Sequence, residues 1–189
     1  ALNGAIHEAG GASPTMTMLD YFRDTLGMTG TKEGCAEGDC GACTVVRVVD
    51  GRFEAVNACL MQIAQADGAE ILTVEGLEQI NGGALTPVQD AMATGDGTQC
   101  GFCTPGFIGA LFALEQSDET ISDDVIHDAL AGNLCRCTGY RPIIEAARDA
   151  CSNIVAYEPQ AVPARSVEHM VDGQTFHAPE TLADLTRLR

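Results

Sequence analysis

The chain has 189 residues, of which 27 are acidic and 10 basic, so its formal charge is −17. A surface this acidic repels phosphate backbones and argues against nucleic acid as a partner. Hydrophobic residues make up 46% of the sequence, which is enough for packed cores. No apolar stretch reaches the roughly 18 residues that a membrane span needs, so we expect no membrane association.

The first 76 residues predict a small mixed sheet that carries one helix. Thr17 can cap this helix and Gly27 can end it, while Asp50-Gly51 is typical of a two-residue hairpin turn. A glycine-rich loop without periodicity separates the helix from the sheet. The expected elements are a helix over 18–26 and strands over 44–49, 52–56 and 71–74.

Beyond Gly76 the composition changes and four short helices are expected. Thr86, Thr104 and Ser122 are start signals, and prolines at the first turn support three of the four starts. Short helices with short connections predict a compact bundle over 77–155. Residues 156–170 contain prolines and show no periodicity, which predicts a linker. A strand over 174–177 and a helix over 181–188 are expected in the tail.

Four cysteines near the first strands have the spacing Cys-x4-Cys-x2-Cys, with the fourth beyond the second strand. This is the plant-type pattern for a 2Fe–2S cluster, and glycines let such a loop turn tightly around its ligand. A structural zinc site and disulfides are the alternatives, but zinc sites usually show two Cys-x2-Cys pairs. The set is Cys35, Cys40, Cys43 and Cys59.

A second set of four cysteines has a different spacing and lies just before two of the expected helices. Helix N-termini would stabilise an anionic group held there. Four cysteines on zinc remain an alternative for this set. Its members are Cys100, Cys103, Cys135 and Cys137, and the ninth cysteine, Cys151, stands outside both sets as a packed thiol. The odd count in glycine loops favours a reducing compartment, so we expect a cytoplasmic protein.

Three segments make the chain recognisable. Thr-Lys-Glu-Gly-Cys-Ala-Glu-Gly-Asp-Cys-Gly-Ala-Cys-Thr-Val (31–45), Gln-Cys-Gly-Phe-Cys-Thr-Pro-Gly-Phe (99–107) and Gly-Asn-Leu-Cys-Arg-Cys-Thr-Gly-Tyr-Arg-Pro-Ile (132–143) closely resemble the iron–sulfur portion of the xanthine oxidase family of molybdenum hydroxylases. The resemblance implies an α+β fold: a plant-ferredoxin-like β-grasp domain over 1–76, followed by a small helical-bundle domain over 77–155. Each domain would bind one 2Fe–2S cluster.

The resemblance also implies partners. Gln99 and Cys137 match positions that contact the molybdopterin cofactor, which would lie on a molybdenum-binding large subunit. The chemistry on substrate would occur there, so we expect no catalytic residue on this chain. Residues 171–189 resemble the opening of the family's FAD domain, so the chain would be the N-terminal piece of a subunit in a hetero-oligomer.

The resemblance thus implies an electron-transfer subunit, in the first place of xanthine dehydrogenase in purine catabolism, passing electrons from molybdopterin through two clusters toward FAD and NAD. The alternatives are the small subunit of an aldehyde oxidoreductase or carbon monoxide dehydrogenase-like enzyme, a free-standing electron carrier, and a zinc scaffold. Arg136, between two expected ligands, could tune the second cluster or form a salt bridge. Surface or packing roles are expected for His7, His127, His169 and His177.

Overall fold

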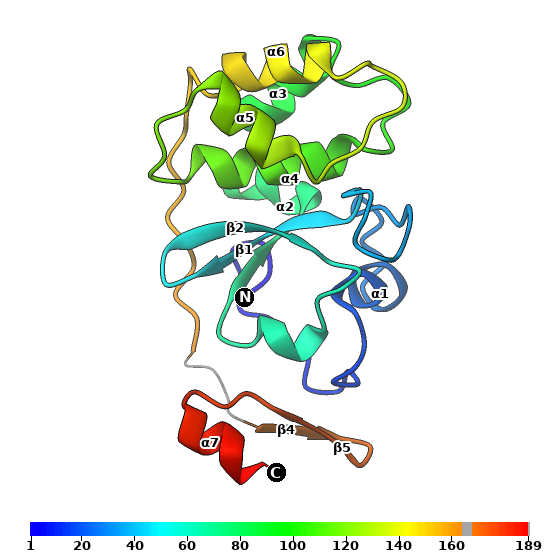
Figure 1. Ribbon diagram of the computed structural model, residues 1–189, viewed down its shortest axis with the longest axis vertical. Helices are drawn as coiled ribbons and strands as arrows, with labels where there is room; N and C mark the ends of the chain where they lie inside the picture. The colour runs from blue at the N-terminus through cyan, green and yellow to red at the C-terminus, as the bar shows by residue number, and fades with distance from the viewer. Residues whose placement is uncertain (164–167, 189) are drawn as a thin grey trace.

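In the computed structural model, which describes residues 1–163 and 168–188, a three-stranded sheet lies between a short helix and a helical bundle (Figure 1). The strands are β1 (Thr44–Val49), β2 (Arg52–Asn57) and β3 (Glu70–Leu72), in the antiparallel order β2-β1-β3. Asp50 and Gly51 join β1 to β2 with positive φ at both residues, as the hairpin prediction requires. The strand predicted over 71–74 exists but is displaced toward the N-terminus.

The predicted first helix is also present, with an unexpected second half. Thr17 accepts a hydrogen bond from the Asp20 N–H at 3.1 Å and begins α1 (Met18–Asp20). The chain then widens into a π-helical turn, η1 (Tyr21–Thr25), before Gly27 turns away with a φ of +69°. A 3₁₀ turn, η2 (Ile63–Ala66), lies between β2 and β3. The periodicity of apolar residues did not indicate the π-helical turn, because a π-turn changes only which carbonyl each N–H donates to.

The helical part contains the four predicted helices and one more. The additional helix is α2 (Val74–Ile80), which spans the boundary expected between residues 76 and 77. Thr86 and Ser122 cap their helices as predicted, accepting hydrogen bonds from the N–H groups of Gln89 and Val125. The four predicted helices are α3 (Pro87–Thr94), α4 (Thr104–Glu115), α5 (Asp123–Leu130) and α6 (Arg141–Ala150).

The two parts share a hydrophobic core across the sheet. Alternate residues of β1 point to opposite faces, so Val45 packs with α1 while Val46 and Val48 pack with the bundle. The bundle's central helix, α4, is buried on nearly every side, which is why it shows no polar face. The position of one part is therefore fixed by its packing against the other.

The chain beyond α6 runs back along the sheet to a small separate unit (Figure 1). Tyr157 donates a hydrogen bond to the buried Glu70 carboxylate at 2.9 Å, and the Gln160 N–H donates to the same carboxylate at 2.7 Å. The unit consists of β4 (Glu168–Val171), β5 (Gln174–His177) and α7 (Leu182–Arg187). Thus β5 and α7 were expected, whereas β4 begins inside the predicted linker. No helix among the described residues is long and apolar enough to cross a membrane.

Candidate metal centres

The first set of cysteines converges at one end of the sheet. Cys35, Cys40 and Cys43 lie on the loop that leads into β1, and Cys59 follows β2, which pairs with β1. The side chains of Cys35 and Cys40 interact directly, and so do those of Cys43 and Cys59. Cys43 also faces the charge of Cys40, which connects the two pairs. The hairpin therefore brings the fourth thiol to a loop that already holds three.

Main-chain N–H groups point at the outer thiol of this set. The Sγ of Cys35 accepts hydrogen bonds from the N–H groups of Asp39 and Cys40, both at 3.3 Å. Main-chain hydrogen bonds from Glu37, Cys40 and Asp39 lower the pKa of Cys35 to about 7, which favours the thiolate that binds metal. Cys43 lies deeper, and burial raises its pKa to about 12.

Gly34 and Gly38 let the first loop close tightly. A Cβ on Gly34 would lie 2.7 Å from the Cys40 Sγ, and one on Gly38 would overlap the Leu60 side chain. Asn57, at the end of β2, donates a hydrogen bond to the Gly38 carbonyl at 2.9 Å. The loop is thus shaped around its four sulfurs, as a cradle for a compact inorganic group would be.

The second set converges between α4 and α6. The side chain of Cys103 interacts with that of Cys135, and the side chain of Cys100 with that of Cys137. The charges of Cys100 and Cys135 also act on one another, so the four thiols form one group. Cys103 is the N-cap residue of α4, where partial positive charge favours an anion. Cys100 and Cys137 are exposed, whereas Cys135 is buried.

Thr138 and Tyr140, which follow Cys137 in the chain, organise this second site. The Cys135 N–H donates to the Tyr140 hydroxyl at 3.0 Å, and the Thr138 hydroxyl lies 3.2 Å from the Cys135 Sγ. Tyr140 has a φ of +69°, an uncommon conformation for a bulky residue. Its ring packs edge-on against Phe107 of α4, with ring centroids 6.4 Å apart. Such strain is kept only where surrounding contacts enforce it, which is typical of functional sites.

The two sites adjoin through the main chain. The Leu134 N–H donates a hydrogen bond to the Cys40 carbonyl at 3.0 Å. Leu134 precedes Cys135 of the second set, and Cys40 belongs to the first. Gly106 of α4 approaches so closely that a Cβ there would overlap the Gly41 carbonyl. A single hydrogen bond thus joins a cysteine of one set to the neighbour of a cysteine of the other.

The donor atoms fit a thiolate-bound iron–sulfur group. Four thiols of one kind at each site are the ligands such clusters use. Within the described part of the chain, no group of three or more Cys, His, Asp or Glu side chains is placed to hold a single metal ion. A two-iron core needs its thiolates more widely spaced than one ion does, because two ligands bind each iron.

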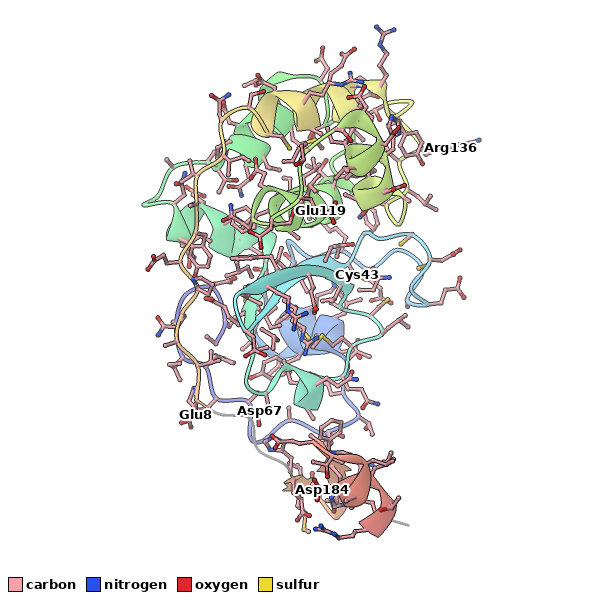
Figure 2. All side chains as sticks on the ribbon, turned by 60° about the vertical axis from the view of Figure 1, so that its left-hand side comes forward. Glu8, Cys43, Asp67, Glu119, Arg136 and Asp184 are labelled. Carbon is pink, nitrogen blue, oxygen red and sulfur yellow. The ribbon has the colours of Figure 1, made fainter. Side chains whose placement is uncertain are left out.

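The remaining predicted residues lie at the surface or in other contacts. Gln99, which precedes Cys100 of the second set, is exposed, and so is Cys137 within that set. Arg136 is exposed and points outward (Figure 2), and it forms no ion pair among the described residues, so the expected alternative of a salt bridge is not found. Cys151 ends α6, and burial raises its pKa to about 11.

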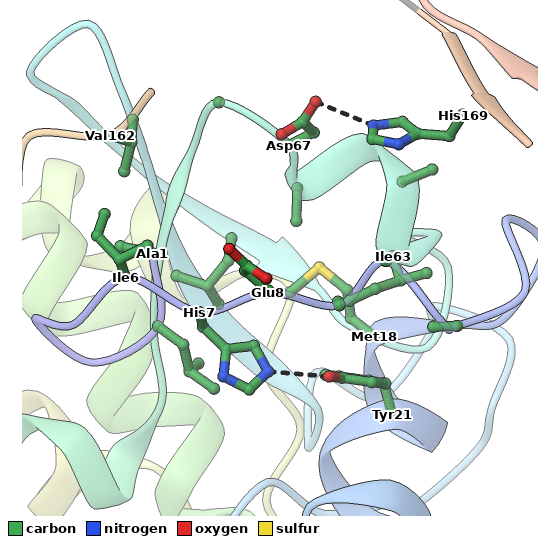
Figure 3. A pocket seen from close by; sticks show the side chains of 18 of the residues that line it. Ala1, Ile6, His7, Glu8, Met18, Tyr21, Ile63, Asp67, Val162 and His169 are labelled. Atoms are coloured by element: carbon green, nitrogen blue, oxygen red, sulfur yellow. Dashed lines mark hydrogen bonds and ion pairs between the residues drawn. The ribbon is translucent and has the colours of Figure 1, made fainter. Parts of the chain in front are cut away.

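A cavity of about 360 Å³ lies between the N-terminal segment, η2 and β4 (Figure 3). His7 hydrogen-bonds Tyr21 at 2.9 Å on one side, and His169 pairs with Asp67 at 3.0 Å on the other. Two of the histidines thus take packing or surface roles, as expected. The cavity contains none of the predicted ligand cysteines and is separate from both sites.

Comparison with known proteins matches two consecutive parts of the chain to two families. Residues 2–73 match the family described as a 2Fe-2S iron-sulfur cluster binding domain, and residues 73–148 match a second family described as a 2Fe-2S binding domain. The α+β fold, with a ferredoxin-type domain followed by a helical one, is thereby confirmed, and the zinc alternative loses its support.

Individual relatives agree. Over 140 residues the chain is 51% identical to xanthine dehydrogenase 1 of Arabidopsis thaliana, a match that covers 70% of this chain and 10% of the relative. A quinoline 2-oxidoreductase structure from Pseudomonas putida 86 is 39% identical, with a TM-score of 0.65, covering 76% of this chain and 89% of that one. The aldehyde oxidoreductase of Desulfovibrio gigas is 39% identical, with a TM-score of 0.71, covering 80% of this chain and 16% of that one. The chain thus spans about a tenth of the curated relatives that it matches.

Proposed function

This chain belongs to the iron–sulfur region of the xanthine oxidase family, and on that basis we propose that it relays electrons from a molybdopterin site on a large partner subunit toward FAD. Electron transfer by the iron–sulfur domains is common to the family. We further propose that the enzyme is a xanthine dehydrogenase and that the partners are a molybdenum-binding subunit and an FAD domain.

We assign the ligands as the sequence predicts: Cys35, Cys40, Cys43 and Cys59 for the first cluster, and Cys100, Cys103, Cys135 and Cys137 for the second. One-electron carriage is the chemistry that a 2Fe–2S cluster supplies when bound. The chain's own contribution is to hold the thiols, to direct N–H groups at the sulfurs, and to keep the two sites adjacent.

The single observation that carries the relay is the contact between the two sites. Leu134 donates to the Cys40 carbonyl at 3.0 Å, so the route from one set to the other crosses one hydrogen bond. The exposure of Cys100, Cys137 and Gln99 supports entry of electrons on that side, where a molybdopterin-bearing partner could touch them.

The tail supports an FAD-containing neighbour. No residue of α7 is buried, and Leu182, Leu185 and Leu188 are exposed by 76%, 51% and 48%. An amphipathic element with an uncovered apolar face is expected to pack against further protein. We propose that the rest of an FAD domain covers it. None of the nine cysteines forms a disulfide, which suits a reducing compartment such as the cytoplasm.

The test uses the full-length subunit together with its molybdenum-binding partner. Anaerobic addition of xanthine should reduce both clusters, observed as two electron paramagnetic resonance signals. Reduction by an aldehyde but not by xanthine would favour the aldehyde oxidoreductase alternative, to which the Desulfovibrio gigas structure also points. A chain that never co-elutes with a molybdenum-containing partner would instead support the free-standing carrier.

A further inference from the structure

A buried amide joins the two cysteine loops beside the hydrogen bond from Leu134. Asn133 is only 5% exposed, and its Nδ2 donates to the Gly41 carbonyl at 2.9 Å and to the Thr44 hydroxyl at 3.2 Å. Both acceptors belong to the first site: Gly41 follows Cys40, and Thr44 follows Cys43. Both N–H groups of the Asn133 amide thus donate to the cysteine loop of the other domain.

The Gly41 carbonyl gathers several donors. Besides Asn133, it accepts hydrogen bonds from the Thr44 N–H at 3.1 Å and the Thr44 hydroxyl at 2.7 Å. Gly41 has a φ of +68°, and a Cβ there would overlap the Gly132 carbonyl. These contacts fix the peptide between Cys40 and Cys43 and leave no room for the loop to move toward the bundle.

Asn133 is itself held firmly on its own side. Its N–H donates to the Leu130 carbonyl at 3.0 Å, which closes the end of α5. The next residue, Leu134, contacts Cys40, and the residue after that is Cys135. A displacement of Asn133 therefore moves the second site, while its amide holds the first.

We propose that Asn133 is a positioning residue that sets the separation and relative orientation of the two cluster sites. The inference rests on the ligand sets of the proposed function. Asn133 touches no proposed ligand sulfur, so it acts through Gly41 and Thr44. Its buried amide is satisfied by two acceptors, and a satisfied buried polar network specifies one arrangement where apolar packing would tolerate several.

The test measures the magnetic interaction between the two clusters in the dithionite-reduced full-length subunit, which depends on their distance and orientation. Asn133→Asp keeps the side-chain shape but removes both donors. It should lose or shrink the spin–spin splitting while iron content stays at the wild-type level. Thr44→Val removes one acceptor and should act in the same direction, whereas Thr44→Ser should restore the wild-type splitting. If Asn133→Asp does not fold, the comparison of Thr44→Val with Thr44→Ser still tests the proposal.

Asn81→Ala is the matched control. It removes an asparagine amide that donates to the carbonyls of Ala84 and Leu85, at 3.1 and 2.9 Å, in the connection between α2 and α3, which carries no cysteine. Its splitting should equal that of the wild type. Unchanged splitting in both Asn133→Asp and Thr44→Val, with only a lower melting temperature, would overturn the positioning role. Loss of either cluster signal in the wild type would instead contradict the proposed function.

Discussion

The Leu134 N–H and the Cys40 carbonyl form a 3.0 Å hydrogen bond that joins the loops of two separate cysteine sets. Leu134→Pro removes this donor, whereas Leu134→Ala keeps it. We expect Leu134→Pro to slow electron transfer between the clusters and to cost about 1 kcal/mol of stability from the lost hydrogen bond, plus any backbone strain. Rapid-mixing reduction followed at both cluster signals measures the rate. Equal rates in the two variants would show that the bond is not on the route.

Ligand replacement separates the two sites. Cys43→Ser should abolish the first cluster and Cys135→Ser the second, each lowering iron from about four atoms per chain to about two. Cys151→Ser is the control, because Cys151 belongs to neither set, and it should keep all the iron. Iron analysis of anaerobically purified protein measures the outcome. Loss of iron in Cys151→Ser, or its full retention in Cys135→Ser, would refute the assigned ligand sets.

The buried carboxyl of Glu115 makes stability depend on pH. It is only 4% exposed, Oε1 has no partner among the described residues, and burial raises its pKa from 4.5 to about 7. The folded state thus holds a proton that the unfolded state releases, so Glu115 destabilises the fold progressively as pH rises from 4.5 to 7. Glu115→Gln should add about 2–3 kcal/mol at pH 8 and little at pH 4.

Denaturant unfolding at the two pH values measures this effect, and exposed Glu119→Gln is the control. A gain in the Glu115 variant that is equal at both pH values would rule out titration as its cause.

The contact between α4 and the first loop depends on Gly106. Alanine inside a helix normally stabilises it relative to glycine by roughly 0.5–1 kcal/mol. Here the new Cβ would overlap the Gly41 carbonyl, so Gly106→Ala should destabilise the protein by about 1–3 kcal/mol. Thermal unfolding measures the change. Gly132→Ala adds a Cβ that meets nothing within 4 Å and should be tolerated. A stabilised Gly106→Ala would mean that α4 lies farther from the loop.

Glu70 holds the chain segment that follows the bundle. Tyr157 and the Gln160 N–H both donate to its carboxylate, and burial together with this contact raises the pKa of Tyr157. Tyr157→Phe should lose a hydrogen bond to a charged group, about 1.5–3 kcal/mol, and expose residues 158–163 to proteolysis. Limited proteolysis with mapped cleavage sites checks this, with Asn153→Ala as the control. Equal cleavage in both variants would contradict the anchoring role.

The sequence predicted those features that depend on local signals. The caps at Thr17, Thr86 and Ser122 and the Asp50-Gly51 turn depend only on neighbouring residues, and they are found where expected. The gathering of the first cysteine set also followed, because spacing and the β1–β2 hairpin bring its thiols together.

Features that depend on tertiary contact were missed. Helix α2 contains Gly76, a weak helix former, and its burial against neighbours stabilises it instead. The roles of Asn133, Thr138 and Tyr140 depend on acceptors and thiols brought near only by folding, although their place beside the Cys-x-Cys of the second set was a usable signal. The shared core was hidden because α4 is apolar on all sides and shows no preferred face.

Electron paramagnetic resonance of the anaerobically purified, dithionite-reduced chain tests the central claim most directly. Two distinct 2Fe–2S signals of equal spin are predicted, with only the first remaining in Cys135→Ser. A single signal in the wild type, no signal at all, or stoichiometric zinc in place of iron would contradict it.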